Sequence, residues 1–149
     1  MVNRTPRTFV WLVLGFAGCA VAVGAARATE SKSVWAGVYT EAQARKGAEL
    51  FTNVCANCHG DDLAGIEQAP ALAGDTFGEK WNTKTLNKLF ERVQDMPPTK
   101  PKSLTPEQYA DILAYVLYVN ELPTGAAPLK ADLTELADIT YSNVKPATK

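Results

Sequence analysis

Two cysteines and the one histidine of the chain fall within five consecutive residues, Cys55-Ala56-Asn57-Cys58-His59. Thiols three residues apart lie on the same side of a helical turn, so both can add to the two vinyl groups on one edge of a porphyrin. The next residue, His59, then lies under the iron, where a neutral imidazole nitrogen serves as an axial ligand. This C-x-x-C-H spacing is the attachment signature of c-type haem, and it predicts one covalently bound haem c.

Three other kinds of site use the same residue types. A zinc site needs four ligands, and beyond the N-terminal segment the chain offers only Cys55, Cys58 and His59 of the usual soft type. A thioredoxin-like redox pair accompanies a βαβ pattern, whereas this sequence shows no strand alternation. A structural disulfide between the two cysteines is the third alternative. The haem interpretation is favoured because it also agrees with a secretory N-terminus and a long irregular segment after the motif.

A second iron ligand is predicted at Met96, which is the only methionine besides the initiator. Because His59 is the only histidine, two imidazoles from one chain cannot ligate the iron. The three prolines that follow Met96 stiffen its segment, which can hold the sulfur over the opposite haem face. Two alternatives stay open: Met96 fills the core, or a deprotonated amine of Lys100 or Lys102 replaces it at high pH.

Helical periodicity accounts for the segments on both sides of the motif. A first helix is predicted to begin at a capping box formed by Thr40 and Gln43 and to continue to the motif. Its apolar positions recur on one helical face, and they are Gly47, Leu50, Phe51 and Val54. A second helix is predicted from Asn82 or Thr83 up to Met96-Pro97, because the residue before a proline is pushed out of the helical region.

The third predicted helix has the clearest start in the sequence. Thr105 supplies the N-cap, Pro106 occupies the first helical position, and Gln108 completes a capping box. Residues Ile112–Val119 are apolar all round, which predicts a buried helix. A shorter helix is predicted from Asp132 to Ile139.

Residues Asp61–Lys80 are rich in Gly, Ala, Pro and Asp and show no sustained period, so they are predicted to form a long loop. A loop of that length is unusual in a compact domain unless something other than protein fills the core beside it. The predicted fold class is all-α. Its core is expected over about residues 40–122, followed by a C-terminal tail over residues 123–149.

The N-terminus has the three parts of a secretory signal. Two arginines and no acid precede the uncharged run Thr8–Ala26, which ends at the small-x-small site Ala26-Arg27-Ala28. Residues 1–28 are therefore predicted to be removed, which leaves residues 29–149 in the periplasm. Two alternatives stay open: a lipoprotein processed at Cys19, and a retained anchor. All three place the folded domain outside the cytoplasm, and only the two alternatives attach it to a membrane.

Composition and charge narrow the class of partner. The chain has 149 residues and is 46% hydrophobic and 21% charged, which is ordinary for one globular domain. It shows no basic stripe, so nucleic-acid binding is not expected. Removing residues 1–28 takes three of the 15 basic residues and none of the 16 acidic ones, so the mature charge falls to −4. A net negative domain is expected to favour basic partner surfaces.

The stretch from Gly47 to Asn120 resembles the class I c-type cytochromes. Besides the haem motif, the matching residues are Gly47, Phe51, Pro70-Ala71-Leu72-Ala73-Gly74, Met96-Pro97 and Ala114-Tyr115-Val116. Within that family the chain is most similar to small bacterial cytochromes found beside, or fused to, quinoprotein alcohol dehydrogenases. The run Ser33–Thr40 and Trp81 before the middle helix also occur there.

The resemblance implies three to five helices around one covalently bound haem, with the first and last helices crossing. Gly47 would let Tyr115 approach closely at that crossing. The Pro70 carbonyl would accept a hydrogen bond from Nδ1–H of His59. Leu72 would pack on the haem face. Trp81 would either donate its indole N–H to a haem propionate or simply be buried.

The function implied is single-electron transfer outside the cytoplasm. The expected donor is a periplasmic dehydrogenase such as a quinoprotein dehydrogenase, and the expected acceptor is a terminal oxidase or another cytochrome. The alternative is a haem enzyme or small-ligand sensor whose sixth coordination position is open.

Overall fold

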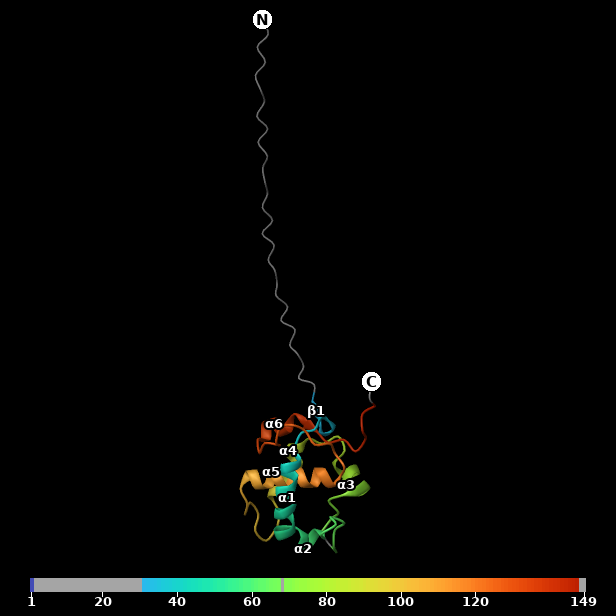
Figure 1. Ribbon diagram of the computed structural model, residues 1–149, viewed down its shortest axis with the longest axis vertical. Helices are drawn as coiled ribbons and strands as arrows, with labels where there is room; N and C mark the ends of the chain where they lie inside the picture. The colour runs from blue at the N-terminus through green and yellow to red at the C-terminus, as the bar shows by residue number, and fades with distance from the viewer. Residues whose placement is uncertain (2–30, 68, 148–149) are drawn as a thin grey trace.

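The computed structural model describes Met1 and residues 31–67 and 69–147, so the predicted signal over residues 1–28 lies almost wholly outside them. Within the described ranges the chain is mostly helical (Figure 1), and the all-α prediction is confirmed. The helices are α1 (Glu41–Val54), α2 (Ala56–His59), α3 (Gly74–Trp81), α4 (Leu86–Gln94), α5 (Pro106–Val119) and α6 (Leu133–Ala137), with a 3-10 turn η1 (Val34–Ala36). In the part of the chain that is described, no helix is both long and apolar enough to cross a membrane.

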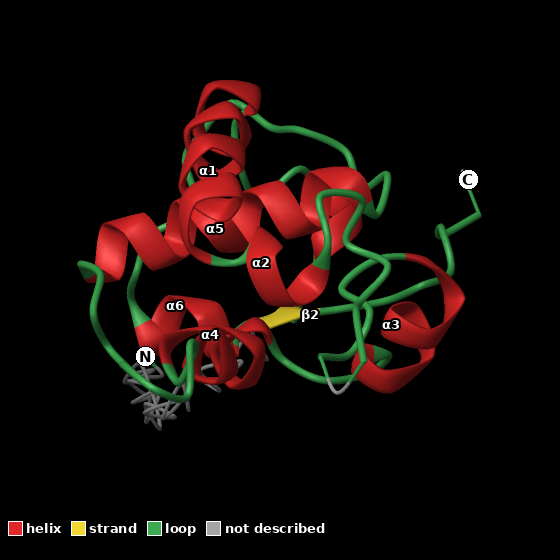
Figure 2. Ribbon diagram, turned by 90° about the horizontal axis from the view of Figure 1, so that it is seen from below, coloured by secondary structure: helices red, strands yellow, loops and turns green. Residues whose placement is uncertain are grey.

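Helices α1 and α5 cross at close range (Figure 2). Gly47 lies at the crossing, where a Cβ atom would come within 1.8 Å of the Asp111 carbonyl oxygen and 2.9 Å of the Tyr115 Cβ. The predicted approach of Tyr115 is therefore present, but the tightest contact is with the backbone of Asp111. Next to it the rings of Phe51 and Tyr115 are tilted at a centroid distance of 5.4 Å. Only glycine lets the two helix backbones come this close.

The core extends beyond the predicted range of residues 40–122. Val34 and Tyr39 precede that range, and Leu129, Leu136 and Tyr141 follow it, yet all five are buried. The segment predicted as a tail instead covers α4 with α6. It also forms a short parallel pair between β1 (Lys32–Ser33) and β2 (Ile139–Thr140), two strands that periodicity did not predict because each has only two residues.

One of the two predicted capping boxes is complete. Thr105 and Gln108 bond reciprocally at the start of α5, as expected. At the start of α1 the Thr40 hydroxyl accepts from the Gln43 N–H at 3.2 Å, but the Gln43 side chain does not reach back. Its amide instead donates to the Leu129 carbonyl at 2.8 Å, and its oxygen accepts from the Leu129 N–H at 2.7 Å. Gln43 thus ties the C-terminal segment to α1, a tertiary contact that overrides the local pattern.

The prediction of one long loop over Asp61–Lys80 was wrong from Gly74 onward, where α3 begins. The helix begins without a side-chain cap at Ala73, so the usual start signal is absent. Phe77 and Trp81 share one face of α3 and are buried, and the Phe77 ring meets Tyr141 edge-on at 5.8 Å. Helix α4 begins three residues later than the latest start expected, because Thr83 has a left-handed φ of 63° that no α-helix can include.

Candidate functional site

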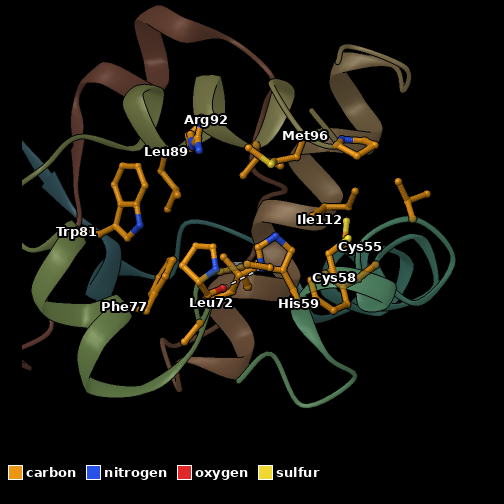
Figure 3. Close-up of a pocket in the computed structure, with 18 of the residues that line it drawn as sticks. Cys55, Cys58, His59, Leu72, Phe77, Trp81, Leu89, Arg92, Met96 and Ile112 are labelled. Atoms are coloured by element: carbon orange, nitrogen blue, oxygen red, sulfur yellow. Dashed lines mark hydrogen bonds between the residues drawn. The ribbon is translucent and has the colours of Figure 1, made fainter. Parts of the chain in front are cut away.

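A cavity of about 350 Å³ lies between α1 and α2 on one side and α3 and α4 on the other, with α5 at its back. Its walls are mostly apolar, and Figure 3 shows labelled side chains of α2, α3, α4 and α5 pointing into it. The structure brings together every site residue expected from the sequence. Cys55, Cys58, His59, Pro70, Leu72, Trp81 and Met96 all line this one cavity.

The two cysteines and the histidine are presented by a sharp change of direction after α1. The Cys55 N–H donates to the Phe51 carbonyl at 2.8 Å and ends that helix. A new turn then starts, in which the Cys58 and His59 N–H groups both donate to the Cys55 carbonyl, at 3.1 and 3.0 Å. This turn places both thiols and the imidazole at the same wall of the cavity (Figure 3). Gly60, with a φ of 76°, ends the turn in a conformation that favours glycine.

His59 is 9% exposed, and a hydrogen bond fixes the orientation of its ring. Its Nδ1 lies 2.9 Å from the Pro70 carbonyl oxygen. Because a carbonyl can only accept, Nδ1 carries the hydrogen, and in the neutral imidazole Nε2 then keeps its lone pair. The Pro70 loop is held by two backbone hydrogen bonds of 2.8 Å, from Leu72 to Leu63 and from Gly65 to His59. The ring is therefore presented in the tautomer that can ligate a metal through Nε2.

Met96 enters the cavity from the wall opposite His59 (Figure 3). It follows the end of α4, where its N–H donates to the Val93 carbonyl at 3.1 Å. On its other side the buried Tyr109 of α5 donates its hydroxyl hydrogen to the Met96 carbonyl at 3.3 Å. The same hydroxyl accepts from the Leu104 N–H at 3.4 Å. The backbone of Met96 is thus held by hydrogen bonds to two different helices, α4 and α5.

Further cavity residues escaped the sequence analysis. Phe77, Leu89, Ile112 and Val116 complete the apolar walls. The sequence marked Ile112 and Val116 only as part of a buried apolar helix. Two cations, Lys80 and Arg92, also line the cavity, and no motif in the sequence singles them out. Beside them the Lys84 ammonium lies 5.4 Å from the centroid of the Trp81 ring. Trp81 lies at the end of the cavity away from the cysteines (Figure 3).

The donor set fits a covalently attached haem better than it fits the alternatives. Two free thiols and an imidazole lie at one wall, a thioether faces them, and the remaining surface is apolar. Burial, with a smaller contribution from Cys58, raises the pKa of the Cys55 thiol to about 11. A thioredoxin-like nucleophile requires the opposite, a lowered thiol pKa. No group of three or more His, Cys, Asp or Glu side chains gathers as a metal site among the described residues, as a zinc centre requires.

Comparison with known proteins agrees with this donor set. A family model described as "Cytochrome C oxidase, cbb3-type, subunit III" matches residues 42–116, which include the cysteine motif, His59 and Met96. The chain is also 30% identical over 105 residues to cytochrome c-551 of Bacillus subtilis (strain 168), a match that covers 69% of this chain and 88% of that protein. The chain belongs to the class I c-type cytochromes.

Two further relatives of this cytochrome are larger proteins. It is 35% identical over 82 residues to the cbb3-type cytochrome c oxidase subunit CcoP of Rubrivivax gelatinosus, covering 52% of this chain but 26% of that one. The sulfane dehydrogenase SoxCD from Paracoccus pantotrophus matches in structure with a TM-score of 0.48 and 31% identity, over 53% of this chain and 44% of that chain. The cytochrome thus spans about a quarter of the first protein and less than half of the second.

Family membership settles the cofactor and the general role of the cytochrome. It binds haem c covalently, and it is a haem-based electron-transfer protein. The resemblance stated from the sequence is therefore confirmed at the level of the family, whereas the association with quinoprotein dehydrogenases stays a prediction.

Proposed function

We propose that this cytochrome carries single electrons in the periplasm, with thioether bonds at Cys55 and Cys58 and with His59 and Met96 as the axial iron ligands. When bound, haem c supplies an iron that accepts and releases one electron. The observation that carries the proposal is the arrangement of His59 and Met96 on opposite walls of one apolar cavity.

The His59 side of the cavity supports ligation by imidazole. The 2.9 Å hydrogen bond to the Pro70 carbonyl holds the hydrogen on Nδ1, which leaves Nε2 available and makes the ring a stronger electron donor. Cys55 and Cys58 lie on the same short turn, so thioether bonds at both would fix the cofactor against this wall. Leu72 and Pro70 add apolar surface beside the imidazole.

The Met96 side supports a ligand that stays in place in both oxidation states. Hydrogen bonds on the Met96 backbone come from the end of α4 and from Tyr109 of α5. With both axial positions filled by side chains that separate elements hold, a change of iron valence needs little movement of the protein. This favours a carrier over an enzyme or sensor with an open sixth position, and a neutral thioether favours the reduced state.

The periplasmic part of the proposal rests on residues 1–28, whose composition is that of a secretory signal. Residues 29–149 then form the mature haem domain. Mass spectrometry of protein made in a secreting bacterial host tests this, because cleavage after Ala28 gives an N-terminal Thr29. An acylated N-terminus at Cys19 would instead establish a lipoprotein bound to the membrane.

The partners proposed are a periplasmic dehydrogenase, such as a quinoprotein dehydrogenase, as donor and a terminal oxidase or another cytochrome as acceptor. The oxidase is supported by the relative that is named as a cbb3-type cytochrome c oxidase subunit. The quinoprotein dehydrogenase rests on sequence resemblance alone.

The test is a visible spectrum and an intact mass of the protein made in a secreting host that attaches c-type haem. The proposal predicts a mass increased by one haem that survives denaturation, and a spectrum that switches reversibly between a ferric and a ferrous low-spin form. A variant with both Cys55→Ala and Cys58→Ala should lose the covalent mass. A wild-type protein that folds fully without haem would contradict the proposal.

A further inference from the structure

Charge is unevenly distributed over the described residues. The segment from Lys80 to Lys102 holds six basic and two acidic side chains, whereas the other described residues hold five basic and thirteen acidic ones. The basic residues of the segment are Lys80, Lys84, Lys88, Arg92, Lys100 and Lys102, and all six are exposed. Although the whole domain is net negative, residues 80–102 therefore carry a net charge of +4.

The structure places these cations on α3, on α4 and in the loop after Met96, segments that contribute one side of the haem cavity. Lys80 and Arg92 line the cavity itself, and the Lys84 ammonium lies over the ring of Trp81, which also lines it. Lys88 precedes Arg92 by one turn on α4, so both side chains point from the same helical face. The basic wall therefore extends along α4.

The loop after Met96 continues the same wall. The Lys100 N–H donates to the carbonyl of Pro97, a cavity residue, at 2.9 Å. The Lys102 N–H donates to the Gln94 carbonyl at the end of α4 at 2.8 Å. The backbone of both lysines is thus anchored close to Met96.

The opposite wall has the opposite sign. The loop that follows His59 carries the exposed Asp61, Asp62 and Glu67 and no basic residue among those described. A partner that approaches the cavity therefore meets a positive potential on the α4 side and a negative potential on the side of the loop after His59. Distant acidic residues matter less, since salt screens charges beyond about 8 Å at physiological ionic strength.

We infer that the redox partner docks an acidic protein surface against the basic wall formed by Lys84, Lys88, Lys100 and Lys102. The inference rests on the proposed electron transfer through the haem cavity, and it reverses the preference for basic partners expected from the net charge. Lys80 and Arg92 are left out of the docking surface because they line the cavity.

The test measures the rate at which the ferrous holoprotein gives one electron to an anionic oxidant, hexacyanoferrate(III), and to a cationic one, tris(phenanthroline)cobalt(III). Raising the salt from about 0.01 M to about 0.15 M shortens the screening length from about 30 Å to about 8 Å. Attraction to the basic wall predicts that the rate with hexacyanoferrate(III) falls several-fold over that range, while the cobalt rate does not fall. A hexacyanoferrate(III) rate that rises with salt would show that the net negative charge decides, and it would overturn the inference.

Matched variants separate local charge from net charge. Lys88→Glu with Lys100→Glu changes the charge by four units on the wall and touches no cavity-lining residue. Lys46→Glu with Lys145→Glu changes the net charge equally at exposed sites away from the cavity. We expect the first pair of substitutions to lower the rate of electron transfer to hexacyanoferrate(III) by on the order of tenfold at low salt. The control pair should lower that rate far less. Equal effects of the two pairs would overturn the inference.

A readout without electron transfer keeps the docking surface separate from the redox role. Poly-L-glutamate is added to the ferrous protein, and amide chemical shifts are followed by NMR. We expect the shifts to change along residues 80–102 and not around Lys46 or Lys145. Changes centred on Lys46 or Lys145, or none, would overturn the docking surface, whereas the failure of the proposed electron transfer would appear as a protein that cannot be reversibly reduced.

Discussion

Replacing Gly47 with alanine should destabilise the cytochrome more than a glycine-to-alanine replacement at Gly78, the other glycine in the interior of a described helix. The new Cβ would lie 1.8 Å from the Asp111 carbonyl oxygen and 2.5 Å from its carbon. Both atoms belong to the backbone of α5, so neither can turn away as a side chain could. Helices α1 and α5 must instead separate.

The expected magnitude follows from that separation. Ordinary contact begins at 3.4 Å, so the two helices must move apart by the difference, 1.6 Å, or bend. A gap of about 0.5–1 Å already removes a quarter to a half of the dispersion attraction between packed surfaces. Overpacking of this kind costs about 1–3 kcal/mol, and the gap adds to it, while alanine returns about 1 kcal/mol through its higher helix propensity. We therefore expect a net loss of about 3 kcal/mol in the free energy of unfolding.

The assay is denaturant unfolding of the ferric holoprotein, followed by far-UV circular dichroism. Gly78→Ala in α3 is the matched control, because its Cβ would meet only Asn143, whose Cβ lies at 3.1 Å and would have to move by only a few tenths of an ångström. We expect that control to stay within about 1 kcal/mol of the wild type. If Gly47→Ala unfolds at the same denaturant concentration as the wild type, the close crossing of α1 and α5 is wrong.

Three further perturbations have defined outcomes. Tyr109→Phe removes the hydroxyl that bonds to the Met96 carbonyl, so cyanide should displace Met96 at lower concentration, and an unchanged cyanide affinity would contradict that positioning role. Burial, with a smaller contribution from Tyr118, raises the pKa of Tyr39 to about 12 from 10.0. Between these two pKa values the unfolded chain binds fewer protons than the folded one, so the contribution of Tyr39 to stability is complete below pH 10 and is lost between pH 10 and about 12. Over that range the urea midpoint should decline less steeply in Tyr39→Phe than in the wild type. Gln43→Ala leaves the N–H and the carbonyl of Leu129 without partners and should lower the unfolding free energy by about 2–3 kcal/mol. The control Gln108→Ala, at the exposed capping box, should lower it by less, and equal losses would argue against the tertiary role of Gln43.

The sequence predicted the site better than the elements around it. Cys55, Cys58, His59 and Met96 belong to short local patterns whose chemistry requires particular residue types, whereas Pro70, Leu72 and Trp81 were expected only from the family resemblance. The capping box at Thr105 was also predictable, because its two hydrogen bonds lie within one turn of helix. Patterns that depend only on neighbouring residues were therefore found.

Features set by distant contacts were not predictable. Gln43 has the right type and position for a capping box, yet its amide bonds to Leu129, which lies 86 residues away. Helix α3 lacks a capping residue and is stabilised by burying Phe77 and Trp81, one of which meets Tyr141. The basic residues between Lys80 and Lys102 are visible in the sequence, but their place beside the haem cavity appears only when the loop after Met96 is folded against α4.

The most direct test of the central claim is the proton NMR spectrum of the ferrous protein. Met96 is the only methionine beyond the initiator, so its methyl group needs no assignment by mutation in the mature chain. If its sulfur ligates the iron opposite His59, the ring current of the porphyrin shifts that methyl resonance far upfield of every ordinary methyl group. Ligation by Met96 predicts one such resonance, absent in Met96→Ala. A covalently attached haem whose spectrum lacks it, and whose iron binds carbon monoxide readily, would contradict the proposed ligation and favour a ligand-binding haem protein.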